Sequence, residues 1–207
     1  MSKRVLVACE VSATVRDAFR ERGHDAWSCD LLPSEGDPRW HIQDDVLNHL
    51  EGWDLMIAHP PCTYLTLAGL HWNYRVEGRS ELTLKALTFV RQLLDAPVKQ
   101  IALENPVGAI SRNIRQPTQI IQPWQFGTPE SKLTCLWLKA LPPLQPTHVL
   151  RPEAYQDNGY SPRWRNQTAT GQNKLAPSPT RWMERSRTYP VIAQAMAEQW
   201  GDWRPLL

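Results

Sequence analysis

Apolar and polar positions alternate in blocks over the first hundred residues. Short apolar runs of the kind that are buried in parallel sheets occupy residues 5–9, 26–29, 55–58 and 101–103. Between them, the stretches 15–22 and 80–94 place apolar residues at helical spacing. Strands that alternate with helices predict an α/β fold with a mostly parallel central sheet and helices on both faces.

The residues around the first helix predict its two ends. Thr14 has a side-chain oxygen that can cap the helix, Asp17 follows three residues later, and Gly23 is a typical stop. A helix N-terminus that follows a strand so closely can also attract an anion.

The pattern changes in the second half of the chain. Strands are predicted at 118–122 and 133–138. Residues 141–178 are rich in Pro, Asn and Gln, which predicts mostly loop. Pro190 then opens a last amphipathic helix.

Residues with useful chemistry stand at the ends of four predicted strands. They are Glu10, Asp30, Cys62 and Glu104. The carboxyl ends of parallel strands meet at one edge of the sheet, where open α/β folds bind their ligands. One polar residue at a strand end means little, but four at successive strand ends predict a functional site.

The chain has 207 residues, of which 42% are hydrophobic and 21% are charged. These values predict a single folded domain, 1–207, and exclude a disordered chain or a fibre. No run approaches the roughly 18 apolar residues of a membrane helix, and the residues after Met1 form no hydrophobic leader. Four cysteines without Cys-x-x-Cys spacing favour a reducing compartment. We therefore expect a cytoplasmic protein with no membrane partner.

The near-neutral net charge of +2 hides an uneven distribution. Residues 1–62 carry 6 Lys and Arg against 11 Asp and Glu, whereas residues 63–207 carry 17 against 10. Part of the basic excess lies near the C-terminus, where arginines stand beside tryptophans, a combination that suits phosphates and bases. The residues expected to contact nucleic acid are Arg163, Trp164, Arg165, Lys174 and Arg181.

A cysteine and a glutamate follow two strands of the same predicted sheet. Pro60 and Pro61 hold Cys62 rigidly at the sheet edge, and Glu104 ends a later strand. A thiol nucleophile and a carboxylic acid can then face one pocket. This pair suits thiolate addition to carbon 6 of cytosine, with protonation of ring N3 by the acid, which makes carbon 5 nucleophilic.

Four segments, spread over about residues 4–200, resemble motifs of the cytosine-C5 DNA methyltransferase family in the family's order. Residues 54–62 resemble its catalytic loop with the Pro-Cys pair. Glu104-Asn105-Pro106 is similar to its Glu-Asn-Val motif. The last two segments, similar to its Tyr-Gly-Val-Pro-Gln-x-Arg segment and to its final motif, are Phe126-Gly127-Thr128-Pro129-Glu130-Ser131-Lys132 and Arg187-Thr188-Tyr189-Pro190.

The resemblance implies a Rossmann-like methyltransferase fold and S-adenosylmethionine as cofactor. Cys62 would be the nucleophile and Glu104 the acid at N3, and Asn105 and Lys132 would complete the catalytic set. Asp30 would bind the ribose. Asp45 would bind the adenine amino group, for which Asp44 is an alternative. The full set of expected cofactor-binding residues is Glu10, Ser12, Asp30, Asp45 and Pro60.

Two features depart from the family's pattern. Its first motif is a glycine-rich turn, whereas the segment from Cys9 to Thr14 contains no glycine and has fewer ways to approach a cofactor carboxylate. Only 54 residues separate Lys132 from Arg187, so the basic loop 147–183 stands in place of a target-recognition domain. A small enzyme of this type would suit a phage or prophage.

Other enzyme classes fit the motifs less well. Amino-methyltransferases carry Asp/Asn-Pro-Pro-Tyr at the same strand end, and Cys62 in place of the aromatic ring favours carbon methylation. RNA C5-methyltransferases place a Thr-Cys pair on a later strand, where this chain has Glu-Asn. A metal site built from His59, Cys62 and His71 would lack a second close pair, and we expect none.

Two questions stay open at the level of sequence. The substrate is cytosine in DNA or a free pyrimidine nucleotide. The second class of function is a catalytically weak relative that binds nucleic acid, which the glycine-free cofactor loop would favour. The oligomeric state is not predicted.

Overall fold

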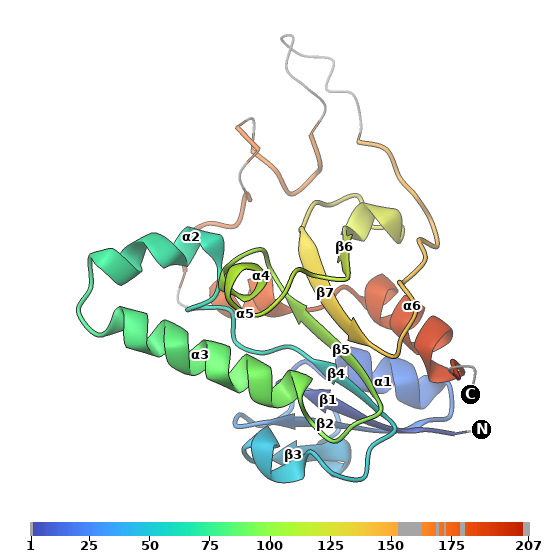
Figure 1. The fold of residues 1–207 in the computed structure, drawn as a ribbon. Coiled ribbons are helices and arrows are strands. Elements are labelled where there is room, and N and C mark those ends of the chain that lie inside the picture. The colour runs from blue at the N-terminus through green and yellow to red at the C-terminus, as the bar shows by residue number, and fades with distance from the viewer. Residues whose placement is uncertain (1, 153–162, 169, 172, 179–180, 205–207) are drawn as a thin grey trace.

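The computed structural model describes residues 2–152, 163–168, 170–171, 173–178 and 181–204. Its centre is a seven-stranded sheet in the order β3-β2-β1-β4-β5-β7-β6 (Figure 1). The strands are β1 (Arg4–Ala8), β2 (Asp25–Asp30), β3 (His41–Gln43), β4 (Leu55–Ala58), β5 (Gln100–Asn105), β6 (Gln119–Ile121) and β7 (Thr134–Lys139). The pairs from β3 across to β5 are parallel, and β7 runs antiparallel to both of its neighbours.

Helices cover both faces of the sheet, as the sequence predicts. Figure 1 shows α3 on one side and α1 with α6 on the other. The α-helices are α1 (Thr14–Glu21), α2 (Leu67–Leu70), α3 (Arg79–Leu94), α4 (Ala109–Asn113), α5 (Arg181–Ser186) and α6 (Pro190–Gly201). The short 3-10 helices are η1 (Pro38–Trp40), η2 (Val46–His49), η3 (His71–Tyr74) and η4 (Pro123–Gln125).

The apolar strand runs are buried because each face of the sheet has its own core. Along β1, Val5 and Val7 belong to the cluster that includes residues of α1 and α6. Leu6 and Ala8 belong to the cluster on the other face, which includes residues of α3. All four are fully buried. Burying a valine or leucine side chain stabilises a fold by roughly 1.5–3 kcal/mol, so these continuous runs explain why the strands form.

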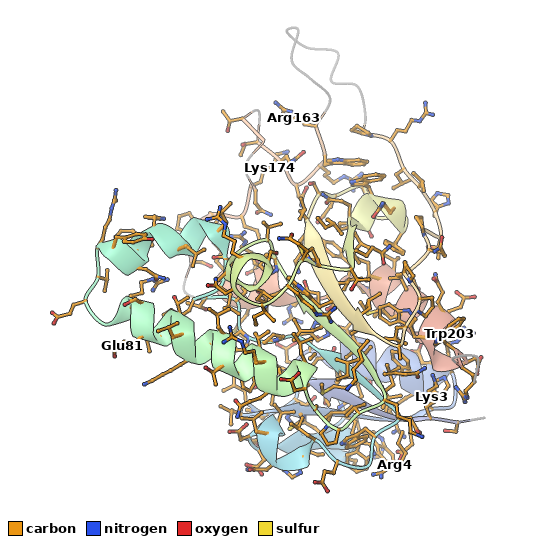
Figure 2. All side chains as sticks on the ribbon, in the orientation of Figure 1. Lys3, Arg4, Glu81, Arg163, Lys174 and Trp203 are labelled. Atoms are coloured by element: carbon orange, nitrogen blue, oxygen red, sulfur yellow. The ribbon has the colours of Figure 1, made fainter. Side chains whose placement is uncertain are left out.

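A buried lysine joins the start of the chain to the last helix. The Nζ of Lys3 donates hydrogen bonds, each of 2.7 Å, to Gln100 Oε1 and to the carbonyls of Trp200 and Trp203. Figure 2 shows Lys3 and Trp203 close together at this end of the molecule. Lys3 precedes β1, so this junction lies at the edge of the sheet opposite the carboxyl ends of the parallel strands, away from the predicted site.

The start of α1 differs from the prediction. Thr14 begins the helix but does not cap it, and Ala13 at the N-cap position makes no side-chain bond. The carboxylate of Glu10 caps the helix instead, because it accepts hydrogen bonds from the backbone N–H groups of Val15 and Arg16. The N-terminus of α1 is therefore already bonded to an anion of the chain itself. The predicted stop is confirmed, since Gly23 has a positive φ of 82° just beyond the helix.

The backbone of the β1–α1 turn accounts for this cap. Cys9 and Ala13 adopt left-handed conformations with φ of 60° and 61° without being glycines. Such residues are uncommon and mark a turn held by its surroundings. The turn brings Glu10 back over the first N–H groups of α1. Sequence reasoning that looks for a capping residue beside the helix does not find a cap four residues upstream.

The second half of the chain follows the predicted pattern where it is described. The strands predicted at 118–122 and 133–138 correspond to β6 and β7, and Pro190 is the first residue of α6. The short elements β3, α2 and α4 were not predicted, because three to five residues carry too little periodicity. Among the described residues, no helix is long and apolar enough to cross a membrane.

Candidate active site

The turn after β4 is fixed by backbone contacts on both sides. His59 N donates to Ala8 O at 2.9 Å, which continues the pairing of β4 with β1. The carbonyl of Cys62 accepts hydrogen bonds from the N–H groups of Leu65 and Thr66 at 2.9 and 3.0 Å. Cys62 is half-buried at the tip of this turn. The thiol is thus presented at the carboxyl edge of the sheet on a closed loop.

Asn105, predicted as part of the catalytic set, stands behind this turn. Its Nδ2 donates a 2.7 Å hydrogen bond to the carbonyl of Pro60, and the residue is 1% exposed. Pro60 itself is buried. The bond joins the ends of β4 and β5, so Asn105 holds the prolines that set the position of Cys62.

Glu104 forms a largely buried pair with His59, which the sequence analysis considered only as a metal ligand. Oε2 of Glu104 lies 3.2 Å from Nδ1 of His59, and the two side chains are 13% and 10% exposed. Burial alone would raise the pKa of Glu104. The hydrogen bond from His59 and the positive charge of Lys132 outweigh burial, so the pKa of Glu104 lies below its ordinary value.

The thiol of Cys62 is surrounded by charges of both signs. Burial, and then the negative charge of Glu104, raise the pKa of Cys62 above its ordinary value. Lys132 and Arg185 act in the opposite direction and favour the thiolate. The described chain therefore brings Cys62, Glu104 and Lys132 into one electrostatic neighbourhood. Arg185 joins them from α5, and the sequence analysis did not select it.

Lys132 is held by the segment that leads into α6. Its Nζ donates a 2.8 Å hydrogen bond to the carbonyl of Arg187. The hydroxyl of Tyr189 donates to Glu130 Oε2 at 2.5 Å, and the guanidinium of Arg187 pairs with Glu35 at 2.7 Å. Residues 187–189 therefore cross from the loop after β2 to the loop before β7. These bonds bring together residues 126–132 and 187–190, the two segments that resemble motifs of the methyltransferase family.

The predicted cofactor residues lie at the ends of the first three strands. Glu10 is 4% exposed and ends the turn after β1, where Ser12 donates to its Oε1 at 3.4 Å. Asp30 ends β2 and accepts a 2.9 Å hydrogen bond from Leu32 N. Asp45 follows β3 and accepts one from Leu47 N at 3.0 Å. We call Glu10, Asp30 and Asp45 the acidic corner.

Two contacts show that the acidic corner is continuous. The backbone N–H of Asp44 donates to Asp30 O at 3.1 Å, which places the ends of β2 and β3 together. Burial raises the pKa of Cys9, and the charges of Asp30 and Asp45 raise it further, so both carboxylates act electrostatically on the end of β1. Asp44 is occupied by His49, whose Nε2 lies 2.8 Å away.

Glu10 connects the acidic corner to the catalytic residues. Burial raises the pKa of Glu10, and the positive charge of His59 lowers it in part. In the order of the strands, β1 with Glu10 and β5 with Glu104 flank β4, which leads into His59. His59 thus follows the strand that lies between β1 and β5, and its charge acts on both carboxylates.

We call the part of the chain from Arg163 to Arg181 the basic segment. Its described residues contact the loop before β7. The ring of Trp164 stacks on Trp124 with centroids 5.6 Å apart and an interplanar angle of 6°. Arg165 N donates to Pro129 O at 3.2 Å, and Lys174 Nζ donates to Arg165 O at 2.9 Å. Arg165 and Lys174 are exposed, whereas Arg163 and Arg181 are half-buried. Figure 2 shows Arg163 and Lys174 projecting at the end of the molecule far from Lys3. Residues 153–162 of the predicted loop lie outside the described residues.

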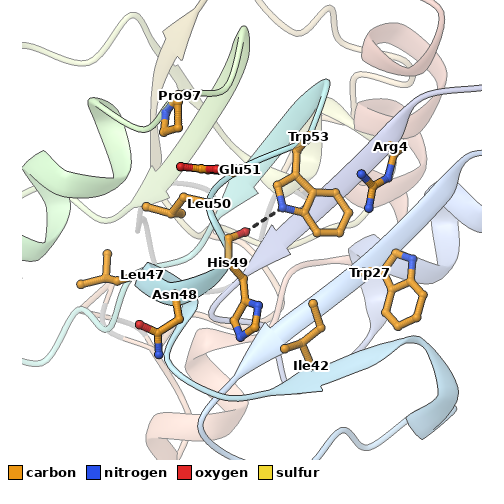
Figure 3. Close-up of a pocket in the computed structure, with 10 residues that line it drawn as sticks. All are labelled: Arg4, Trp27, Ile42, Leu47, Asn48, His49, Leu50, Glu51, Trp53 and Pro97. Atoms are coloured by element: carbon orange, nitrogen blue, oxygen red, sulfur yellow. Dashed lines mark hydrogen bonds between the residues drawn. The ribbon is translucent and has the colours of Figure 1, made fainter.

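A pocket of about 610 Å³ lies elsewhere in the molecule (Figure 3). It is lined by Arg4, Trp27, Ile42, Leu47, Asn48, His49, Leu50, Glu51, Trp53 and Pro97. None of these is a residue selected from the sequence. The guanidinium of Arg4 lies 4.8 Å from the ring centroid of Trp53 and bonds Gly52 O at 2.9 Å. The pocket is therefore separate from the residues of the candidate site.

The described parts of the chain contain no cluster of potential metal ligands. No group of three or more His, Cys, Asp or Glu side chains there could hold a metal ion. Cys29 and Cys135 are fully buried in the sheet core, whereas Cys9 is partly exposed at the end of β1.

No protein-family model and no curated protein matches the chain. Among solved structures, the chain is similar to a candidate DNA modification methyltransferase encoded within an E. coli prophage, at 14% identity and a TM-score of 0.43. The match covers 73% of this chain and 53% of that chain, so this chain spans about half the length of that neighbour. Such a distant likeness does not identify a substrate. The strand order and the helices on both faces define a Rossmann-like fold of the methyltransferase type.

Proposed function

We propose that this chain transfers a methyl group from S-adenosylmethionine to carbon 5 of cytosine in DNA. The observation that carries the proposal is that Cys62 and Glu104 come from the adjacent strands β4 and β5 and that the charge of Glu104 acts on the thiol. A thiol nucleophile beside a carboxyl group, both close to the cation Lys132, is the donor set that addition to a pyrimidine ring requires.

Each residue has a definite task in this chemistry. Cys62 adds as a thiolate to carbon 6 of the base, and Glu104 delivers a proton to ring N3, so carbon 5 becomes an enamine carbon. Bound S-adenosylmethionine would supply the methyl group for this carbon. Loss of the C5 proton to solvent and expulsion of Cys62 as a thiolate would then restore the aromatic ring and the free enzyme. Lys132 and Arg185 favour the thiolate by their charge. Asn105 keeps the Pro60 carbonyl, and hence the turn that carries Cys62, in place.

The acidic corner fits part of this cofactor. Carboxylates of Asp30 and Asp45 are suitable acceptors for the hydroxyl and amino groups of a nucleoside. The site also contains a buried polar atom, Nε2 of His59, that bonds to none of the residues that the structure describes. The N-terminus of α1 contributes less than the sequence suggests, since Glu10 already accepts from Val15 N and Arg16 N.

The first experiment tests methyl transfer itself. Labelled cofactor is incubated with duplex DNA, single-stranded DNA or dCMP, with Cys62→Ala as the control. We expect label in DNA from the wild-type chain and none from the variant. Transfer to dCMP alone would move the assignment to a free-nucleotide enzyme. No transfer to any substrate, or equal transfer by the variant, contradicts the proposal.

The second experiment tests contact with DNA. Arg165 and Lys174 are exposed on the basic segment, so each is free to neutralise a phosphate. The double variant Arg165→Ala/Lys174→Ala should bind DNA more weakly, and its salt dependence should fall by about one unit of slope per lost contact. Arg22→Ala is the matched control, because Arg22 is exposed beyond the C-terminal end of α1. Equal losses in the two variants would contradict a DNA contact at this segment.

A further inference from the structure

His59 interacts with two other ionisable groups, Glu104 and Glu10, and we call these three residues the row. Its Nδ1 faces Glu104 at 3.2 Å, and its charge also acts on Glu10. The two carboxylates come from strands on either side of β4 and supply a counter-charge for an imidazolium. Beyond His59, the titratable groups that interact electrostatically with Glu104 are Lys132, the thiol of Cys62 and the thiol of Cys135 on β7.

The row offers a source for the proton that the proposed reaction needs at N3. Protonation of N3 needs a carboxylic acid, but the pKa of Glu104 is lowered despite its burial, by the hydrogen bond from His59 and by Lys132. At neutral pH Glu104 is therefore a carboxylate and has no proton of its own to give. A neighbour that can release a proton near neutral pH has to supply one, and an imidazole is the side chain suited to this.

Lys132 is less suited to that role than His59. Its Nζ is bonded to the carbonyl of Arg187 at 2.8 Å, which holds the ammonium as a fixed charge. His59, in contrast, directs a ring nitrogen at the carboxylate within hydrogen-bonding distance. The second ring nitrogen of His59, the buried Nε2, bonds to none of the described residues.

We propose that His59 is a positioning residue that also supplies the proton for Glu104, an inference that rests on the proposed function. As the Cys62 sulfur bonds to carbon 6, the Nδ1–H bond breaks and its electron pair stays on the imidazole. The proton passes to the Glu104 carboxylate, and the carboxyl group gives a proton to N3. Glu104 begins and ends the step as a carboxylate, and His59 ends it neutral. When the thiol is expelled, the N3 proton returns by the same route.

His59→Asn separates the two roles of the residue. The Asn side-chain amide can keep a donor near the position of Nδ1, but it has no proton that titrates. We expect this variant to fold and to bind DNA with an unchanged KM, while its kcat at neutral pH falls by about 100-fold. His59→Ala should lose the hydrogen bond as well. His71→Asn, at an exposed residue of η3, is the matched control and should keep the wild-type rate.

The pH dependence of kcat gives the sharper readout. The wild-type rate should rise as Cys62 ionises and fall as His59 loses its proton, which gives a bell-shaped profile. His59→Asn should keep the rising limb and lose the falling limb. A residue that only supported the fold would lower the rate at all pH values and leave both limbs in place.

The possible outcomes distinguish a failure of this inference from a failure of the proposed function. Methyl transfer by the wild-type chain, with His59→Asn showing the same rate or keeping the falling limb, overturns the role of His59 alone. No transfer by the wild-type chain overturns the proposed function and this role with it. NMR of histidine-labelled protein adds a test that leaves His59 intact: the ring-nitrogen signals of His59 should move in Glu104→Gln, which alters the partner of Nδ1, and unchanged signals contradict the pair.

Discussion

Two regions of the same sheet edge hold their polar residues in different ways. In the acidic corner, carboxylates are bonded by groups a few residues away, as Glu10 is by Val15 and Arg16, and Asp45 by Leu47. Around Cys62, the bonds join distant parts of the chain. His59 meets Glu104 across 45 residues, and Lys132 meets Arg187 across 55. The region around Cys62 therefore depends on the whole fold, whereas the acidic corner is assembled largely by its own loops.

The difference shows which residues fix the geometry that the proposed reaction needs. Hydrogen bonds between near neighbours in the sequence order a loop. They do not fix its position relative to the other strands, which depends on packing. Bonds between strands set the distance from nucleophile to acid, which a covalent reaction needs to within fractions of an ångström. We expect substitutions around Cys62 to change kcat, and substitutions in the acidic corner to change cofactor binding or local stability.

The largest effect is expected from Cys62→Ala. Without the thiolate no covalent adduct can form at carbon 6, so transfer should fall by ~10⁴-fold or more. The half-buried thiol contributes little packing, and the thermal midpoint should change by only a few degrees. The measurement is label transfer together with a thermal unfolding scan. Residual transfer within tenfold of the wild type would remove Cys62 from the mechanism.

Asn105→Leu tests a bond between strands that touches no substrate. The change removes the 2.7 Å bond to Pro60 O and leaves that carbonyl unsatisfied in a buried place. We expect a loss of about 2 kcal/mol in the free energy of unfolding and a fall of roughly 100-fold in kcat. Urea unfolding and steady-state kinetics measure the two quantities. A stability loss with unchanged kcat would mean that the turn finds its position without Asn105.

Glu10→Gln tests the acidic corner by the same two measurements. The variant keeps one of the two acceptors for the N-terminus of α1 and leaves the other backbone N–H unpaired, so the free energy of unfolding should fall by about 1 kcal/mol. KM for the cofactor should rise several-fold while kcat changes little. A loss of kcat as large as that of Asn105→Leu would break the contrast between the two regions.

Asp37→Asn should have the smallest effect, visible only in acid. Asp37 accepts hydrogen bonds from the side chain and the backbone N–H of Arg39, which lower its pKa from 3.8 to about 2. Its ionised form favours the folded state above about pH 4, and this contribution is lost as the pH falls through 2. The thermal midpoint of Asp37→Asn should thus drop less than that of the wild type between pH 4 and pH 2. Parallel curves would show that this exposed pair has no effect.

The sequence predicted those parts of the site that depend on periodicity and strand ends. The apolar runs located β1, β2, β4 and β5, and their ends gave Cys62 and Glu104. It did not predict the His59–Glu104 pair, because nothing local links residues 45 positions apart. The sequence predicted Thr14 as the cap of α1 and missed Glu10. The turn that folds Glu10 back needs positive φ angles at Cys9 and Ala13, and no glycine marks these positions in the sequence.

The position of the transferred methyl group tests the central claim most directly. DNA treated with the wild-type chain and labelled cofactor is hydrolysed to nucleosides, and the labelled nucleoside is identified by mass spectrometry. The pairing of Cys62 with Glu104 predicts 5-methylcytosine from the wild-type chain and none from Cys62→Ala. Label in N4-methylcytosine or N6-methyladenine, or 5-methylcytosine formed equally by Cys62→Ala, would contradict it.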